Sequence, residues 1–339
     1  MVTAPHMSVV EASSECYPQC SEYRRTAAMA KGPDGATFTL DIFRVKGGGK
    51  HTWRAFSEVA ASDMADGSLS FEGIAMPPEP PIPDYGASEA TEHIAGLRDV
   101  RCEGNPPPSW RAVWSDARRS YRLWMLSPVD RVQAGHGPGQ ETWEEAGRRV
   151  RCVEAIREGD DVESVFVAVH DPAGVVTSAE IVETIPHTDP NAVVVQITSE
   201  WGTYLVFSDC ADEVETDRAR FAGAFGALCI PLIGPRWYLA SGARTLMTVD
   251  GFGFDNGMPE FESVARRDGY DRIALETAIP REQHPVPDDV KHYVAIETDT
   301  LATGLPIARM DERTITVDTF PVPDDIRRVR YEAVRYARE

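Results

Sequence analysis

The sequence predicts an all-β protein, in which a large antiparallel β-sandwich is followed by a smaller β domain. Short runs of β-branched and aromatic residues recur between glycine, proline, asparagine and aspartate residues, and no long segment keeps a helical apolar period. The chain has 339 residues, of which 42% are hydrophobic, so it can bury a large core. We expect the sandwich over residues 1–249 and the smaller domain over residues 250–339.

The first expected element is a β-hairpin over residues 38–56, where two strand-like runs flank a triple-glycine break. Asp41 lies within the first run, and a carboxylate buried in a strand needs a cation or hydrogen-bond donors. Two registers are open. In one, Asp41 lies opposite Arg54 and forms a cross-strand ion pair. In the other, shifted by one residue, Asp41 shares a face with His51 and Trp53, which permits a polar or metal site.

Further strands follow along the chain. The expected pairs are residues 109–114 with 121–126, 148–156 with 162–170, and 192–198 with 202–208. Trp110, Trp114 and Trp124 lie in the first of these pairs; alternation in a strand favours a core position for them, and the alternative is a stacking platform for sugar rings. The tail, residues 326–338, fits either a helix face or a strand, and we assign it as a strand.

Charge and cysteine content restrict the function. The formal net charge of −20 argues against nucleic acid as a partner, because phosphate binding needs clustered positive charge. Such an acidic protein could still hold a polyanionic glycan in an arginine-lined cleft. The six cysteines include no Cys-x-x-Cys motif, so free thiols are expected, with a Cys16–Cys20 disulfide as the alternative.

No membrane partner is expected, because no stretch approaches the roughly 20 apolar residues of a membrane span. The N-terminal residues lack the basic and apolar regions of a signal peptide. We therefore expect a cytoplasmic protein, or one of the cell envelope if the chain is a fragment of an exported parent.

Several short segments carry a family resemblance. They are Val9-Val-Glu-Ala-Ser-Ser14 with Tyr17-Pro-Gln19 and Tyr23-Arg-Arg-Thr26, then Asp41-Ile-Phe-Arg-Val-Lys-Gly-Gly48 followed by Lys50-His-Thr-Trp53, and last Ser164-Val-Phe-Val-Ala-Val-His-Asp-Pro172. In this order they resemble the C-terminal β-sandwich half of heparinase II/III-like polysaccharide lyases. The resemblance implies β-elimination on uronate polysaccharides. In that family a helical toroid before the sandwich supplies most reactive groups, and nothing here resembles the toroid.

The resemblance also implies site residues. His51 and Tyr23 are the candidates for catalysis, and Asp41 with His51 for binding a divalent metal, zinc or calcium. The candidates for substrate binding are Arg44, His136 and Trp53. The sequence departs from the family pattern after His51, since Thr52 replaces a frequent aspartate and Phe56 a frequent second histidine.

Three functions are consistent with this sequence. The first is a lyase-derived β-sandwich that binds a glycan or completes a split lyase by docking a separate helical-toroid subunit. The second is an active enzyme that uses Asp41, His51, Tyr23 and nearby arginines without a toroid. The third is a structural or assembly module with no sugar ligand.

Overall fold

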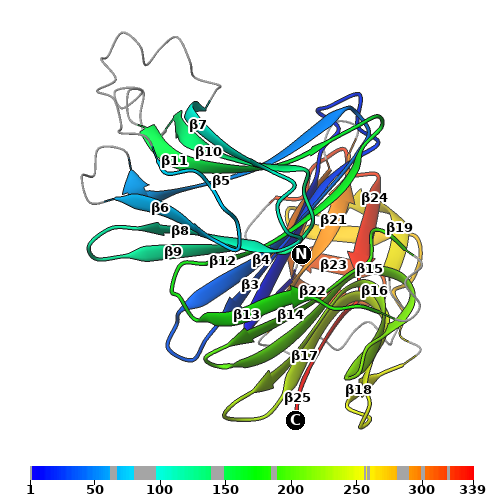
Figure 1. The fold of residues 1–339 in the computed structure, drawn as a ribbon. Coiled ribbons are helices and arrows are strands. Elements are labelled where there is room, and N and C mark those ends of the chain that lie inside the picture. The colour runs from blue at the N-terminus through cyan, green and yellow to red at the C-terminus, as the bar shows by residue number, and fades with distance from the viewer. Residues whose placement is uncertain are drawn as a thin grey trace. The chain divides into compact units, whose positions relative to one another are not determined.

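The computed structural model describes residues 2–61, 67–79, 97–138, 149–184, 189–255, 257, 260–280, 290–298, 302–318 and 321–339. All regular secondary structure within these described residues is β-strand, and the strands form large antiparallel sheets (Figure 1). The predicted all-β fold is therefore confirmed.

The described chain separates into two compact units. Unit 1 consists of Met1–Val10, Ala30–Pro33 and Glu180–Glu339, and unit 2 consists of Glu11–Met29 and Asp34–Ala179. Each unit has its own hydrophobic core clusters.

Unit 2 is a β-sandwich. Its larger sheet has the order β3-β4-β12-β9-β8-β6 and its smaller sheet β5-β11-β10-β7. The bounds are β3 Glu22–Lys31, β4 Thr37–Lys46, β5 Lys50–Ala61, β6 Ser68–Glu72, β7 Arg98–Gly104, β8 Trp110–Ser115, β9 Ser120–Met125, β10 Arg131–Pro138, β11 Arg149–Glu158 and β12 Glu163–Asp171. One core cluster takes residues from both sheets, including Phe43 of β4, Trp53 of β5 and Val153 of β11.

The prediction of a hairpin over residues 38–56 is wrong, because β4 and β5 belong to different sheets. β4 pairs with β12 and β5 pairs with β11, so the chain crosses from one layer to the other at the glycine triplet. Gly47 adopts φ +98° there, and a Cβ on it would lie 2.4 Å from the carbonyl oxygen of Gln19. Strands β11 and β12, expected to be adjacent, are likewise divided between the two sheets.

The predictions for two other strand pairs are confirmed. β8 pairs with β9, and β14 pairs with β15, in the expected antiparallel hairpins. The burial of β8 alternates strictly, and Trp110, Trp114 and Trp124 are all buried, as the core interpretation requires. Apolar side chains at every second position of a strand turn to one face, so this alternation fixes which face meets the core.

Unit 1 contains two further groups of strands. The first has the order β13-β14-β15-β16-β17-β18, with β25 also paired to β17, and the second has the order β22-β23-β20-β19-β24-β21-β1-β2. The bounds are β1 Val2–Ala4, β2 Met7–Ser13, β13 Val176–Ile181, β14 Val193–Ser199, β15 Gly202–Glu215, β16 Ala219–Pro231, β17 Trp237–Thr248, β18 Gly253–Phe254, β19 Glu260–Arg267, β20 Arg272–Leu275, β21 Lys291–Glu297, β22 Ala302–Asp311, β23 Thr314–Val317, β24 Arg328–Glu332 and β25 Val334–Arg338.

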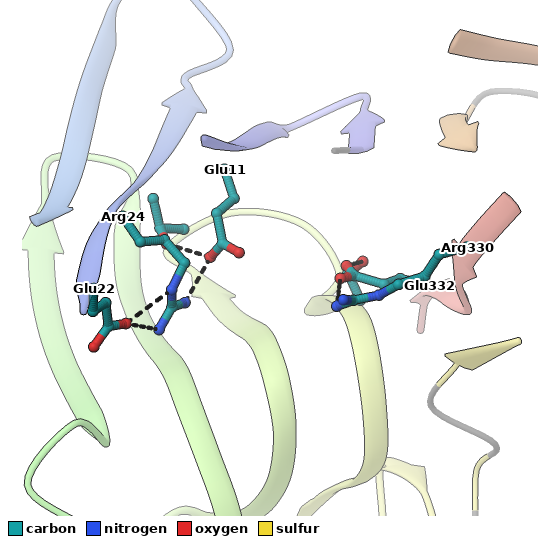
Figure 2. Close-up of polar contacts among 7 residues, drawn as sticks. Glu11, Glu22, Arg24, Arg330 and Glu332 are labelled. Atoms are coloured by element: carbon teal, nitrogen blue, oxygen red, sulfur yellow. Dashed lines mark hydrogen bonds and ion pairs between the residues drawn. The ribbon is translucent and has the colours of Figure 1, made fainter. Parts of the chain in front are cut away.

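The tail is extended, as assigned from the sequence, but it forms two strands, β24 and β25, that pair with different partners. In β24, Val329 and Tyr331 are buried in a core cluster, whereas Arg330 is exposed between them. Arg330 donates to Glu332 on the same side of the strand, at 3.2 Å (Figure 2). A period of two, with apolar and charged residues on opposite faces, is what a half-buried strand requires.

Candidate functional site

The candidate site in unit 2 begins with the alternation of side chains along β3. Arg24 donates to Glu22 at 2.7 Å and to Glu11 at 3.0 Å (Figure 2). Successive side chains of a strand point to opposite faces, so Tyr23 and Arg25 lie on the other face from this network. That face is the one on which β4 presents Asp41.

Asp41 is a buried carboxylate with several donors. Arg25 donates from Nε to Oδ1 at 2.7 Å and from Nη2 to Oδ2 at 2.5 Å, which is a two-bond fork. Trp53, from the opposite sheet, donates its indole N–H to Oδ2 at 3.0 Å. The predicted need of Asp41 for a partner is met by Arg25 rather than by Arg54, which donates to Glu154.

His170 and Tyr121 extend this arrangement across the sheet. His170 Nε2 lies 3.5 Å from Asp41 Oδ2, and His170 Nδ1 is hydrogen-bonded to the Tyr121 hydroxyl. The four side chains Arg25, Asp41, His170 and Tyr121 come from the adjacent strands β3, β4, β12 and β9 and are called the polar row below. With the Nε2 proton directed at Asp41, His170 Nδ1 accepts a hydrogen bond from the Tyr121 hydroxyl.

The polar row shifts the pKa values of its members in opposite directions. Burial alone would raise the pKa of the Asp41 carboxyl, but hydrogen bonds from His170 and Arg25 outweigh it and lower that pKa. Burial, together with the negative charge of Asp41, raises the pKa of the Tyr121 phenol well above its usual value. Tyr121 therefore keeps its proton at neutral pH and holds it in the hydrogen bond to His170.

Aromatic rings lie beside the accessible end of the row. The side chain of Arg25 is 50% exposed, and its guanidinium lies 5.8 Å from the centre of the Phe43 ring. Tyr23 packs edge-on against Phe43 at 4.9 Å, and Tyr17, which is 45% exposed, contacts Tyr23 at 5.0 Å. We call Tyr17, Tyr23 and Arg25 the tyrosine–arginine surface.

His51, a predicted catalytic and metal residue, lies in another environment. Its Nε2 is 2.7 Å from the Gly47 carbonyl oxygen and its Nδ1 is 2.8 Å from Ser164 Oγ, so it ties the β4–β5 crossing to β12. It forms no hydrogen bond to Asp41, the other predicted metal ligand. Within the described ranges, no group of three or more His, Cys, Asp or Glu side chains could hold a metal ion. Zinc or calcium binding stays a prediction.

The predicted substrate-binding residues are all buried. Trp53 is 2% exposed and bonds to Asp41, and Arg44 lies among the fully buried side chains of β4. The sequence His136-Gly-Pro-Gly139 predicts a turn, but this prediction is wrong for His136, which lies within β10. Gly139 is outside the described residues. His136 Nε2 bonds to Glu79 at 2.8 Å, and Arg151 donates to the same oxygen at 2.7 Å.

The structure thus brings Tyr23 and Asp41 together with residues that the sequence did not single out. In the sequence, His170 is only the last residue of an expected strand, and Tyr121 is only the first residue of another. The resembled segment 164–172 contains His170, which was the one available signal. Their meeting depends on the pairing of β12 with both β4 and β9, which no local pattern specifies.

Comparisons of the sequence with protein-family models and with curated proteins found no match. Among the described residues, no helix is long and apolar enough to cross a membrane.

Proposed function

We propose that unit 2 binds an acidic glycan at the tyrosine–arginine surface, as a β-sandwich derived from the C-terminal half of a heparinase II/III-like lyase. One observation carries the proposal: a half-exposed arginine is held by a buried carboxylate beside two tyrosine rings. The second part, descent from a lyase, is supported only by the resembling segments.

The fork from Asp41 gives Arg25 a fixed geometry. Two of its nitrogens, Nε and Nη2, bond to the carboxylate, and Nη1 takes part in neither bond. An arginine that is already ordered loses less conformational entropy when it binds a ligand. A uronate carboxylate at this position would form a charge-assisted hydrogen bond with the guanidinium.

The tyrosines supply the apolar part of sugar recognition. One face of a pyranose ring carries C–H groups, which pack on an aromatic ring, and a phenol hydroxyl can bond to the sugar hydroxyls. Tyr17 and Tyr23 are in contact and at least partly accessible, so they offer two rings and two hydroxyls next to one cation.

His170 and Tyr121 continue the polar row from Asp41 as a hydrogen-bonded pair. β-Elimination needs neutralisation of the uronate carboxylate, a base for the C5 proton and an acid for the leaving oxygen. Arg25 suits the first task, and we propose that a separate helical-toroid subunit supplies the base and the acid. On this proposal the chain alone binds the glycan without cleaving it.

The test is isothermal titration calorimetry with tetragalacturonate and, as a neutral ligand of equal length, maltotetraose. We expect tetragalacturonate to bind and added salt to weaken it, because a charge pair is involved. Tyr17→Ala and Arg25→Met are expected to weaken binding, each by about tenfold, which equals about 1.4 kcal/mol. Arg24→Met is the matched control, because Arg24 is the neighbouring arginine on the opposite face.

Several outcomes would decide against the proposal. No binding of either ligand by the folded wild-type chain would favour a structural module, the alternative function. Equal losses of affinity for tetragalacturonate in Arg24→Met and Arg25→Met would show only a general effect of positive charge. A rise in the ultraviolet absorbance of unsaturated uronate with this chain alone would replace binding by complete lyase activity.

A further inference from the structure

Unit 1 contains a cavity of about 300 Å³ that the proposed function does not use. It lies where the turn between β14 and β15, the loop of residues 231–236 and the segment Ala30–Pro33 meet. The residues lining it are mainly aromatic and apolar, with a few charged groups. Concave sites of this size and character are the usual form of small-molecule binding sites.

Part of the cavity lining is a group of aromatic rings in mutual contact. Trp237, at the start of β17, stacks with His6 at a ring separation of 5.6 Å and an angle of 24°. Tyr204 of β15 meets Trp237 edge-on at 6.1 Å. Trp237 and Tyr204 are both buried, so their rings are held by the surrounding packing and present a preformed surface.

Trp201 forms one wall and is positioned by a glycine. A Cβ on Gly32 would lie 2.2 Å from the Trp201 ring, so the indole occupies the space that any side chain at position 32 would need. The backbone N–H of Leu232 donates to the Trp201 carbonyl oxygen at 2.7 Å, which ties the next wall to this turn. The walls are therefore connected to one another by direct contacts.

The loop that carries Leu232 leaves large apolar side chains uncovered. Leu232 is 73% exposed and Ile233 is 94% exposed, although both line the cavity. Apolar area left in water at the mouth of an aromatic cavity is removed from water when an apolar ligand enters, at about 25 cal/mol per Å². This loop supplies a driving force for binding.

The charges at the cavity are mainly positive, in a protein whose formal net charge is −20. Lys31 and Arg338 both line it, against one carboxylate, Glu200. In the part of the chain that the structure describes, neither Lys31 nor Arg338 forms an ion pair. Two uncommitted cations beside an aromatic surface favour a ligand with a negative group.

We propose that this cavity binds a small, flat, largely apolar ring compound that carries one carboxylate. Its ring lies against Trp237 between Trp201 and the loop of residues 231–236, and its carboxylate lies between Lys31 and Arg338. A neutral sugar fits less well, because the lining contains no Asn or Gln side chain and only one acid to bond the ring hydroxyls.

The experiment measures binding of naphthoate by isothermal titration calorimetry, with naphthalenemethanol as the neutral ligand of the same ring. We expect naphthoate to bind at least about fivefold tighter than the alcohol, as one partly exposed charge pair allows. The double variant Lys31→Met/Arg338→Met is expected to bind naphthoate and naphthalenemethanol with equal affinity. Arg309→Met is the control, because Arg309 is a 72% exposed cation of unit 1 outside the cavity.

Two further variants test the ring position. Trp201→Ala removes a wall, and Ile233→Ser alters a side chain too exposed to affect folding. Each variant is expected to weaken the binding of both ligands by about three- to tenfold. The proposal is overturned if naphthoate does not bind the folded wild type. It is also overturned if the cavity variants bind as the wild type does, or if Arg309→Met loses as much affinity as Lys31→Met/Arg338→Met. Because unit 1 is probed with a ligand that is not a glycan, these results are independent of the glycan proposal.

Discussion

Asp41 shows how one buried charge organises its neighbours. Its carboxylate is bonded by Arg25 and Trp53 and lies close to His170, so donors from three strands converge on two oxygens. Burying a carboxylate is costly unless such partners are present. The same contacts that make the charge tolerable also order Arg25, and the proposed glycan site depends on that order.

Asp41→Asn is expected to lower the free energy of unfolding by about 2 kcal/mol at neutral pH, since hydrogen bonds to a charged group contribute about this much. The pKa of Asp41 is lowered in the folded protein, so its stabilisation is present above the unfolded value of about 4 and is lost as pH falls through the folded pKa. Urea unfolding at several pH values measures the difference between variant and wild type.

That difference should therefore shrink under acid conditions. Asp217→Asn is the matched control, because its side chain is 81% exposed, and it should change the unfolding free energy little at any pH. A difference for Asp41→Asn that stays constant into strong acid would contradict the assigned pKa direction.

At the scale of elements, the crossing between β4 and β5 is the feature that decides the site. A hairpin would have put the two strands edge to edge in one sheet. The crossing instead puts them in facing sheets, so that Trp53 reaches Asp41 through the core. His51 and Gly47 are both parts of this crossing, which gives each of them a structural role that can be measured.

His51→Leu is expected to lower the free energy of unfolding by about 1–3 kcal/mol, because it leaves the Gly47 carbonyl and Ser164 hydroxyl without their buried partner. Ser164→Ala, which removes only one of these bonds, should cost less. Chemical denaturation measures both. Unchanged stability of His51→Leu, together with loss of glycan binding, would instead assign His51 to the functional site.

Gly47→Ala is expected to destabilise the protein more than Gly35→Ala, with a difference of about 1–3 kcal/mol. Both glycines have a positive φ, +98° and +86°, so both substitutions introduce similar backbone strain. Only at Gly47 would the new Cβ meet backbone, at 2.4 Å from the Gln19 oxygen, whereas Gly35 has open space. Thermal or urea unfolding of the two variants compares them, and equal effects would mean that the crossing relaxes freely.

At the scale of the whole molecule, the excess of acidic residues is the dominant physical property. The chain has 54 Asp and Glu residues against 34 Lys and Arg. Many arginines form ion pairs, as Arg236 does with Asp250 and Glu339, but the surplus negative charge remains. Mutual repulsion of like charges opposes the compact state.

The melting temperature is expected to rise by a few degrees when sodium chloride increases from about 0.01 M to about 0.15 M, because the Debye length falls from about 30 Å to about 8 Å. Differential scanning calorimetry measures it, and potassium chloride at equal ionic strength should give the same shift. A lower melting temperature in salt would mean that the surface ion pairs outweigh the net repulsion.

Only some residues of the polar row could be predicted from the sequence. The requirement that Asp41 have a partner follows from its place in an apolar strand, and the resemblance put Tyr23 near it. Arg25 could not be chosen over Arg54 without knowing that β3, not β5, is the neighbour of β4. His170 and Tyr121 meet because their strands, β12 and β9, pair although they are about 50 residues apart in sequence. Such pairing is set by contacts between distant parts of the chain, which a local sequence pattern does not specify.

The sequence by itself determined the all-β class, the alternation that buries the tryptophans of β8, and the local hairpins β8–β9 and β14–β15, because these depend on side-chain period and short turns. Only the tertiary structure decided that β4 and β5 face each other across the core. A tight glycine turn allows pairing within a sheet or crossing between sheets, and the choice depends on distant strands, here β12 and β11, that offer the backbone partners.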